Sequence, residues 1–191
     1  MKTRLVGGEA ADVFYLDASE APGLIDTGVL EPLNDYVTDD FDLEDFQEPL
    51  LNAFKSEGTY YGFPKDFSTL SLFYNKEAFE EAGLEGPPET WEELQEYAEK
   101  LTVDEDGDGQ PERFGLGISQ ELARQFYKFQ PHGGQVTDSE GNAAFAGDNA
   151  IEALQPVVDM YTDGKTAGLP SDVGTGWGGN MFGHGKAARV I

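Results

Sequence analysis

The stretch TYYGFPKDFSTLSLFYNKEAFEEAGLEGPPETWEELQEYAEKL spans residues 59–101 and decides the fold. Its apolar run Leu70–Tyr74 is rich in aliphatic and aromatic side chains and predicts a strand. The next segment, Lys76–Ala82, predicts a short helix, which Gly83 ends because glycine readily adopts the left-handed conformation that closes helices. A strand followed directly by a helix is typical of layered α/β folds.

A longer helix is predicted after the rigid Pro87-Pro88 spacer. Thr90 and Glu93 match the capping box, in which each side chain accepts a hydrogen bond from a backbone N–H at the start of the helix. The predicted helix ends at Leu101. Its inward face carries Trp91, Leu94, Tyr97, Ala98 and Leu101. Large apolar side chains on such a face usually lie in the core, so Trp91 is interpreted as a core residue.

Toward the N-terminus, two shorter elements and one longer helix are predicted. The apolar run Val13–Leu16 predicts a buried strand, and Ala21–Thr27 predicts a short helix that Gly28 stops. Asp42 can cap a helix from Leu43 to about Phe54, because its carboxylate can accept a hydrogen bond from the first helical turn.

Toward the C-terminus, strand and helix patterns continue to alternate. Phe114–Ile118 predicts a strand, and Glu121–Gln130 predicts a helix stopped by Pro131. Asp148 is expected to cap a helix that runs to about Asp163, with Ile151, Leu154, Val158 and Tyr161 at helical spacing. Pro156 lacks the N–H that the helical ladder needs and predicts a kink. The alternation of strands and helices predicts an α/β fold.

The charge balance argues against two classes of partner. The chain carries 12 Lys+Arg and 37 Asp+Glu, a formal net charge of −25. Nucleic acids and anionic membranes both attract clustered basic side chains, so neither is an expected partner. The 39% hydrophobic and 12% aromatic content indicates a folded chain rather than a disordered one.

An acidic, lysine-poor surface suggests adaptation to high salt, where the Debye length falls to about 3 Å at 1 M and self-repulsion is relieved. On this halophilic hypothesis the chain folds poorly in salt-free buffer, and full stability there would contradict it. The chain has no cysteine, which excludes disulfides and thiolate metal sites. No apolar run reaches the roughly 18 residues of a membrane span, and the first residues lack the apolar core of a signal peptide.

Five segments together resemble the extracellular solute-binding proteins of ABC importers, in particular their sugar-binding, maltose-binding-like branch. The resemblance runs from about Ala11 to Ile191. Its motifs are ADVFYLD (11–17), LIDTGVLEPLNDY (24–36), YGFPKDFSTLSLFYNKEAFEEAG (61–83), PPETWEELQEYAEKLT (87–102) and FGHGKAARVI (182–191).

The resemblance implies a fold of the periplasmic-binding-protein type II kind, with two lobes of which the first is incomplete. Residues 1–64 would form a partial N-terminal lobe, 65–69 the crossover and hinge, and 70–191 a nearly complete C-terminal lobe. Full members of the family have about twice this length and continue into a ligand-contacting Gly-x-Trp segment. The expectation is therefore a partial chain that lacks the family's export signal.

The resemblance also implies a function. A member of this family captures a sugar or oligosaccharide by closing a cleft between its lobes, performs no catalysis and needs no cofactor. It then docks on the membrane subunits of an ABC permease. It acts as a monomer, outside the cell, on the cell surface or in the periplasm.

Ten residues are candidates for ligand binding because they match positions where the family binds sugar. They are Asp17, Ser19, Glu20, Lys65, Asp66, Ser68, Gln120, Glu121, Phe126 and Trp177. Flat aromatic faces and planar polar groups are what a sugar site needs. Each of the acids also fits a solvated surface position, and Trp177 fits a core position as well as a ligand platform.

Asp104, Asp106 and Asp108, followed by Gly109, form an alternating pattern typical of a calcium loop. An EF-hand also needs a glutamate at its twelfth position, where this chain has glycine, so Glu112 could contribute only in another geometry. The sequence thus leaves two interpretations open, a structural calcium ion and an ordinary Asp-Gly turn.

Two rival functions remain. A glycoside hydrolase would use a pair of carboxylates, but no pair stands out from the acidic background. A calcium-stabilised fragment without a competent cleft is the other alternative. The run at 174–179 matches G-x-G-x-x-G, but no predicted strand precedes it, so dinucleotide binding is not expected.

Overall fold

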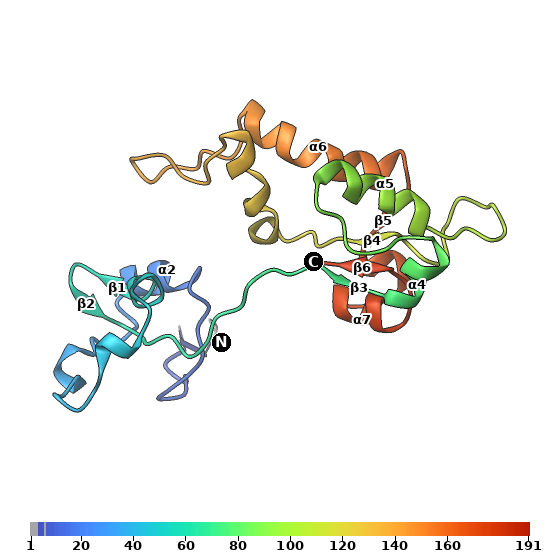
Figure 1. The fold of residues 1–191 in the computed structure, drawn as a ribbon. Helices are drawn as coiled ribbons and strands as arrows, with labels where there is room; N and C mark the ends of the chain where they lie inside the picture. Colours follow the sequence, from blue (N-terminus) through green and yellow to red (C-terminus); the bar gives the residue numbers. More distant parts are fainter. Residues whose placement is uncertain (1–3, 6) are drawn as a thin grey trace. The chain divides into compact units, whose positions relative to one another are not determined.

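The computed structural model describes residues 4–5 and 7–191, and in it the chain divides into two units, Met1–Thr69 and Leu70–Ile191. Residues 64–72 have neither helical nor strand structure, and residues 65–71 are all exposed. Among the described helices, none is both long enough and apolar enough to cross a bilayer. Figure 1 shows the ribbon of the two units, coloured along the sequence.

The first unit consists of short helices and one hairpin. Its elements are α2 (Ala21–Asp26), η1 (Asn34–Tyr36), η2 (Leu43–Asp45), α3 (Glu48–Asn52), β1 (Lys55–Ser56) and β2 (Thr59–Tyr60). Strands β1 and β2 pair antiparallel through a two-residue turn. Both turn residues, Glu57 and Gly58, have positive φ, which matches the right-handed twist of a tight hairpin.

Side chains from separate segments hold this hairpin. The side chain of Asn34 accepts a hydrogen bond from the Tyr60 N–H at 2.7 Å and donates one to the Gly58 carbonyl at 3.2 Å. The Phe63 ring contacts the rings of Phe41, Phe46 and Tyr60, with centroids 4.7–6.1 Å apart. This aromatic cluster packs the segments before the hairpin against the residue that follows it.

Two predictions for the first unit are wrong. The segment Val13–Leu16 has no regular structure, because none of the described strands pairs with it, and Val13 is 89% exposed. The helix predicted from Leu43 to Phe54 is interrupted after η2. The reason is Pro49, which can stand in the first turn of a helix such as α3 but not in the interior of a longer one. The predicted helix cap is confirmed, since the Asp42 side chain accepts from the Glu44 N–H.

The second unit is a four-stranded mixed sheet with helices. Its strands are β3 (Phe73–Tyr74), β4 (Leu116–Gly117), β5 (Ala167–Gly168) and β6 (Arg189–Val190), in the order β3-β6-β4-β5. Strand β6 pairs antiparallel with β3 and parallel with β4, and β4 pairs parallel with β5. Its helices are α4 (Lys76–Glu81), α5 (Trp91–Leu101), α6 (Asp148–Thr162) and α7 (Gly178–Gly183), with the 3₁₀ turns η3 (Leu122–Arg124), η4 (Phe126–Lys128), η5 (Gln130–His132) and η6 (Pro170–Val173).

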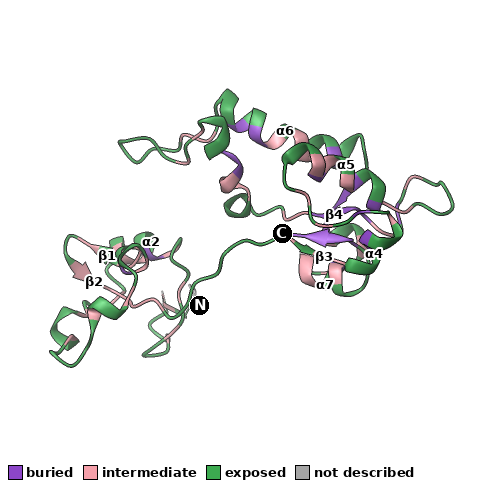
Figure 2. Ribbon diagram, viewed as in Figure 1, coloured by how far each residue is buried: buried purple, intermediate pink, exposed green. Residues whose placement is uncertain are grey.

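Helices α5 and α6 lie on one side of this sheet and α7 on the other (Figure 1). On the first side, Leu94 and Ala98 of α5 and Met160 of α6 pack with Leu116 and Ala167 of the sheet. On the second side, Met181 of α7 packs with Phe114, Ala187 and Val190. Buried residues concentrate in these layers (Figure 2). The two helical layers bury the sheet on both faces, as an α/β fold requires.

Helix α5 is confirmed from Trp91 to Leu101, and α4 with its closing Gly83 is confirmed as well. The Thr90 side chain accepts from the Glu93 N–H at 3.1 Å, as predicted. The returning bond differs by one residue, since the Glu93 carboxylate accepts from the Glu89 N–H rather than from that of Thr90. Trp91 is not a core residue, because it is 40% exposed.

The remaining predictions for the second unit need correction. Strands β3 and β4 are shorter than the predicted Leu70–Tyr74 and Phe114–Ile118. The predicted helix 121–130 is three separate 3₁₀ turns, η3, η4 and η5. Helix α6 begins at Asp148, but its N-cap is Gly147, and no side chain caps it. Its buried residues are Ala150, Ala153 and Met160, whereas Ile151 and Val158 are about half exposed.

Candidate ligand-binding site

In the first unit, candidate site residues lie along segment 13–17, which has no regular structure, and in the turn after it. The Glu20 N–H donates to the Asp17 carbonyl at 2.9 Å, which forms a turn that leaves Asp17 and Ser19 exposed. Glu20 is half-buried and occupies the N-cap position of α2. The turn therefore presents polar side chains at the start of a helix, where they remain accessible to a ligand.

Lys65 lies close to Tyr15, which belongs to segment 13–17, and pairs with Asp66. The Lys65 Nζ lies 4.8 Å from the centre of the Tyr15 ring and 2.5 Å from the Asp66 carboxylate. The hydrogen bond and charge of Asp66 raise the pKa of Lys65, which therefore stays protonated. Tyr15 is 80% exposed and offers a free aromatic face. Ser68 is exposed as well.

In the second unit, a hollow lies where strand β4 ends. Its walls come from the first turn of α5, from residues just after β4, from the turns η3 and η4, and from α6. The lining residues are Trp91, Leu94, Leu116, Gly117, Ile118, Ser119, Arg124, Gln125, Tyr127, Lys128, Val157 and Ile191. The space enclosed is about 20 Å³, enough for roughly one water molecule. This hollow is therefore too small to enclose a sugar by itself.

An aromatic pair forms one side of the hollow. The rings of Trp91 and Tyr127 stack with their centroids 5.9 Å apart. Burial raises the pKa of Tyr127 to about 12, so its hydroxyl is neutral at physiological pH. Exposed aromatic faces of this kind bind the C–H surfaces of sugars, and the neighbouring polar groups can bind hydroxyls.

A buried cation, the side chain of Lys128, also lines the hollow. Lys128 is only 6% exposed, and its Nζ donates to the Gln125 side-chain oxygen at 2.5 Å. The Gln125 amide in turn donates to the Ser119 carbonyl at 2.8 Å. Burial lowers the pKa of Lys128 to about 8. Arg124, at the same hollow, pairs through its Nε with the Glu121 carboxylate at 2.7 Å.

The structure separates the four site residues predicted for the second unit. Gln120 and Glu121 are exposed on the segment beside the hollow, and Glu121 reaches it through Arg124. Phe126 does not line the hollow, because it packs with Phe129 and Phe145 in a hydrophobic cluster beneath α6. Trp177 is 63% exposed at the N-terminus of α7, with its ring folded over Gly179.

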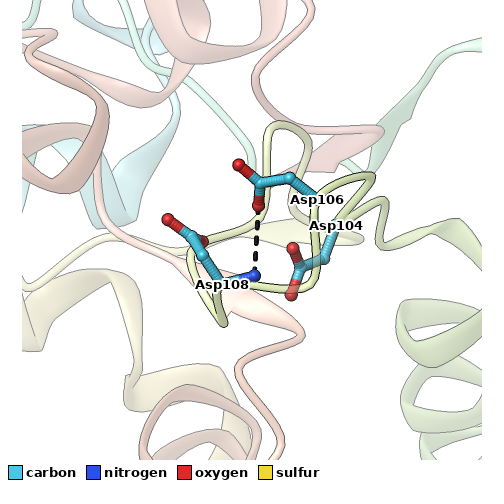
Figure 3. A group of neighbouring side chains, drawn as sticks. All are labelled: Asp104, Asp106 and Asp108. Atoms are coloured by element: carbon cyan, nitrogen blue, oxygen red, sulfur yellow. Dashed lines mark hydrogen bonds between the residues drawn. The ribbon is translucent and has the colours of Figure 1, made fainter.

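The acidic loop of the second unit gathers three of the four residues proposed for calcium. Carboxylate oxygens of Asp104, Asp106 and Asp108 lie within 4.8 Å of one another (Figure 3). Each also accepts backbone N–H bonds within the loop, such as Gly107 to Asp104 at 2.9 Å. The Glu112 carboxylate instead accepts from the Glu105 N–H at 2.9 Å, which fixes the base of the loop. All three aspartates are exposed.

Sequence reasoning missed Tyr15, Trp91, Tyr127 and Lys128 as site residues. Lys128 carried a signal, because a lone lysine stands among Phe126, Tyr127 and Phe129 in an apolar stretch. Burial of an unpaired charge is unfavourable, so a lysine in such surroundings is expected either at the surface or in a functional site. Trp91 carried no such signal, since its position in the helical pattern is the same for a core residue and for one at an open edge.

The model of the family described as bacterial extracellular solute-binding protein matches residues 1–190. An arabinooligosaccharide-binding protein of Halalkalibacterium halodurans is 29% identical over 161 residues, 81% of this chain and 34% of that protein. An sn-glycerol-3-phosphate-binding periplasmic protein of Rhizobium meliloti is 47% identical over 49 residues, 25% of this chain and 11% of that protein.

Among solved structures, the ABC substrate-binding protein Lmo0181 of Listeria monocytogenes, in complex with cycloalternan, matches 99% of this chain with a TM-score of 0.88 and 27% identity. The match covers 49% of the Listeria chain. The present chain thus spans about half the length of the Listeria chain, and its matches to the two curated relatives cover a smaller share of their lengths. The α/β fold of the periplasmic-binding-protein type II kind, inferred from the sequence with an incomplete first lobe, is confirmed over about half the length of such a protein, and these relatives are binding proteins.

Proposed function

The chain belongs to the family of bacterial extracellular solute-binding proteins, and from this premise we propose that the protein captures a sugar or oligosaccharide for an ABC importer without chemical change. The observation that carries the proposal is the hollow of the second unit. There the Trp91–Tyr127 wall stands beside the polar groups of Ser119, Arg124 and Gln125. An apolar wall with a few convergent polar groups is the usual form of a small-molecule site.

The proposal includes the setting that the family implies. The protein would act outside the cytoplasm, as a monomer, and deliver its ligand to the membrane subunits of a permease. Residues 65–69 would serve as the hinge for closure on the ligand, which suits a segment that is exposed and has no regular structure. Closure follows when the ligand binds the closed form more tightly than the open form.

In the first unit, the proposed hydroxyl-binding groups are Asp17, Ser19, Lys65, Asp66 and Ser68. Tyr15 would provide an aromatic face for the ligand. The support for these residues is their exposure, together with the position of the Lys65 Nζ 4.8 Å from the centre of the Tyr15 ring. Lys65→Met and Tyr15→Ala should each weaken sugar binding. Lys55→Met is a suitable control, since Lys55 is also exposed and also lies over a tyrosine ring, that of Tyr60.

The experiment is thermal unfolding in molar KCl against a panel of mono- and oligosaccharides, including maltotriose. A ligand that binds only the folded state stabilises it by about 2.7 kcal/mol at a hundredfold excess over its Kd. A saturable shift with one sugar, reduced in Trp91→Ala and retained in Trp91→Phe, supports the proposal. Hydrolysis of a chromogenic glycoside would instead favour a carbohydrate enzyme, and no shift with any sugar would overturn sugar capture.

A further inference from the structure

Lys128 is the buried cation that the sugar-binding proposal leaves unexplained. Its side chain is more than nine-tenths buried and lines the hollow at the end of β4. Among the residues that the structure describes, the one hydrogen-bond partner of its Nζ is the neutral side chain of Gln125, at 2.5 Å. Within residues 4–5 and 7–191, no carboxylate pairs with it, although the chain has 37 acidic residues.

A buried charge without a counter-charge is unfavourable, and replacing it with an apolar side chain of similar size often costs nothing. The ring of Tyr127, whose centroid lies 5.4 Å from the Lys128 Nζ, compensates only in part. Burial lowers the pKa of Lys128 to about 8, so most molecules still carry the charge at neutral pH. The fold alone therefore gives no reason for a lysine here.

A second cation lines the same hollow. The Glu121 carboxylate contacts Arg124 at Nε, and among the described residues no bond occupies the two Nη groups of Arg124. Those groups can still donate to a ligand, because a guanidinium has five N–H donors in a fixed fork. The hollow thus combines two cations, one amide and an aromatic wall.

We propose that the ligand carries an anionic group, a phosphate or a carboxylate, on a hydroxylated body, and that Lys128 and Arg124 bind this group while Trp91 and Tyr127 contact the body. The inference rests on the proposed function, because it assigns a chemical class to the ligand of the same hollow. Charge-assisted hydrogen bonds to a desolvated lysine are strong, and the ligand would supply the counter-charge that the protein lacks.

The test is isothermal titration of the full natural chain with matched pairs of probes at one KCl concentration. The pairs are sn-glycerol-3-phosphate with glycerol and D-glucuronate with D-glucose, and maltotriose serves as a neutral oligosaccharide. At least one anion should bind more tightly than its neutral partner. Binding of the phosphate alone would point to organophosphates, and binding of the glucuronate alone to acidic sugars.

Three variants assign the preference to Lys128. Lys128→Met, which nearly preserves the side-chain volume, and Lys128→Gln should each reduce the affinity for the anion by about 10- to 100-fold. Lys76→Met removes one exposed positive charge outside the hollow and should retain the preference. Cooperative thermal unfolding shows that each variant is folded.

The outcomes separate the two proposals. If neutral sugars bind and the anions show no advantage, the anionic ligand is wrong while sugar capture stands. An anion preference that persists in both Lys128 variants also overturns the inference, because another group must then bind the charge. If no probe binds, the proposed capture of sugars or their derivatives fails as well.

Discussion

The indole ring of Trp91 and the phenol ring of Tyr127 stack at 5.9 Å between centroids, with 26° between their planes. Trp91 is the first residue of α5, and Tyr127 lies in the 3₁₀ turn η4 that follows strand β4. The pair therefore joins two segments that are distant in sequence. It also presents an aromatic surface beside Lys128, where the end of the sheet leaves a hollow.

Trp91 should report ligand binding by fluorescence. The chain has two tryptophans, so Trp177→Phe leaves Trp91 as the only one. Titration of this variant with maltotriose and with sn-glycerol-3-phosphate should change its emission for the ligand that binds, because the indole lines the hollow. In Trp91→Phe, the emission of Trp177 should change little. The reverse pattern would place the ligand at Trp177 and contradict the assigned site.

Lys128→Met should stabilise the ligand-free protein at neutral pH. Burial lowers the pKa of Lys128 from 10.5 to about 8, so the unfolded state binds this proton more tightly than the folded state. The folded state is therefore penalised at pH 7 by up to about 3 kcal/mol. Above pH 8 the folded lysine is already neutral, so the penalty shrinks as the pH rises and vanishes near pH 10.5, where the unfolded lysine loses its proton too.

Urea denaturation at several pH values checks this prediction. The free energy of unfolding of Lys128→Met should exceed that of the parent at pH 7, and the difference should narrow above pH 8. Lys76→Met, an exposed change, should stay within about 0.5 kcal/mol of the parent. A Lys128→Met variant that is less stable at pH 7 would mean that the lysine stabilises the fold without any ligand.

Arg189→Lys should destabilise the second unit. Arg189 is fully buried, and its guanidinium donates to the carbonyls of Gly115 at 3.1 Å and Leu94 at 2.9 Å. A lysine ammonium is also charged, but it lacks the planar fork that reaches both acceptors. We expect a loss of about 1.5–3 kcal/mol in urea denaturation. Arg124→Lys, at a half-exposed position, should change stability little, and equal effects of the two changes would refute the assignment.

Gly115→Ala should be among the most damaging single changes in the chain. A Cβ at Gly115 would lie 2.0 Å from the carbonyl oxygen of Ala98, so strand β4 and helix α5 would have to separate. The expected loss is about 3 kcal/mol or more, measured by thermal and urea unfolding. Gly183→Ala is the control. Apart from its chain neighbours and its own helix backbone, no atom of the described residues lies within 4 Å of its added Cβ, and alanine at this helical position should be neutral or slightly stabilising.

Calcium binding at the acidic loop remains a proposal with a direct test. The three aspartates place carboxylate oxygens within 4.8 Å, and an exposed site of this type binds with a Kd of about 10⁻⁴–10⁻³ M. Calorimetry should show one saturable site, weakened in Asp106→Asn, which keeps the acceptor for the Asp108 N–H. If the parent and the variant give the same weak heats, calcium does not bind specifically at Asp106, and the loop is an ordinary Asp-Gly turn.

Local sequence patterns correctly predicted the helices that a capping residue begins or a glycine ends. Helix α5 matched from Trp91 to Leu101 because Thr90 caps its first turn, and α4 and α2 matched because Gly83 and Gly28 close them. Strand positions were harder to predict. Val13–Leu16 has strand composition, but a strand also needs a partner for its backbone groups, and composition does not show whether one is present.

The sequence by itself determined the α/β class, the family and the bounds of α2, α4 and α5, because composition, spacing and capping act between residues close in the chain. Tertiary structure alone decided which side chains form the candidate site. Trp91, Tyr127 and Lys128 meet because strand β4 ends between α5 and η4. Phe126, which directly precedes Tyr127 in sequence, turns instead into the cluster with Phe129 and Phe145. A 3₁₀ turn has three residues per turn, so adjacent side chains leave the backbone in different directions. Which of them enters the hollow and which enters the hydrophobic cluster depends on packing against segments distant in sequence.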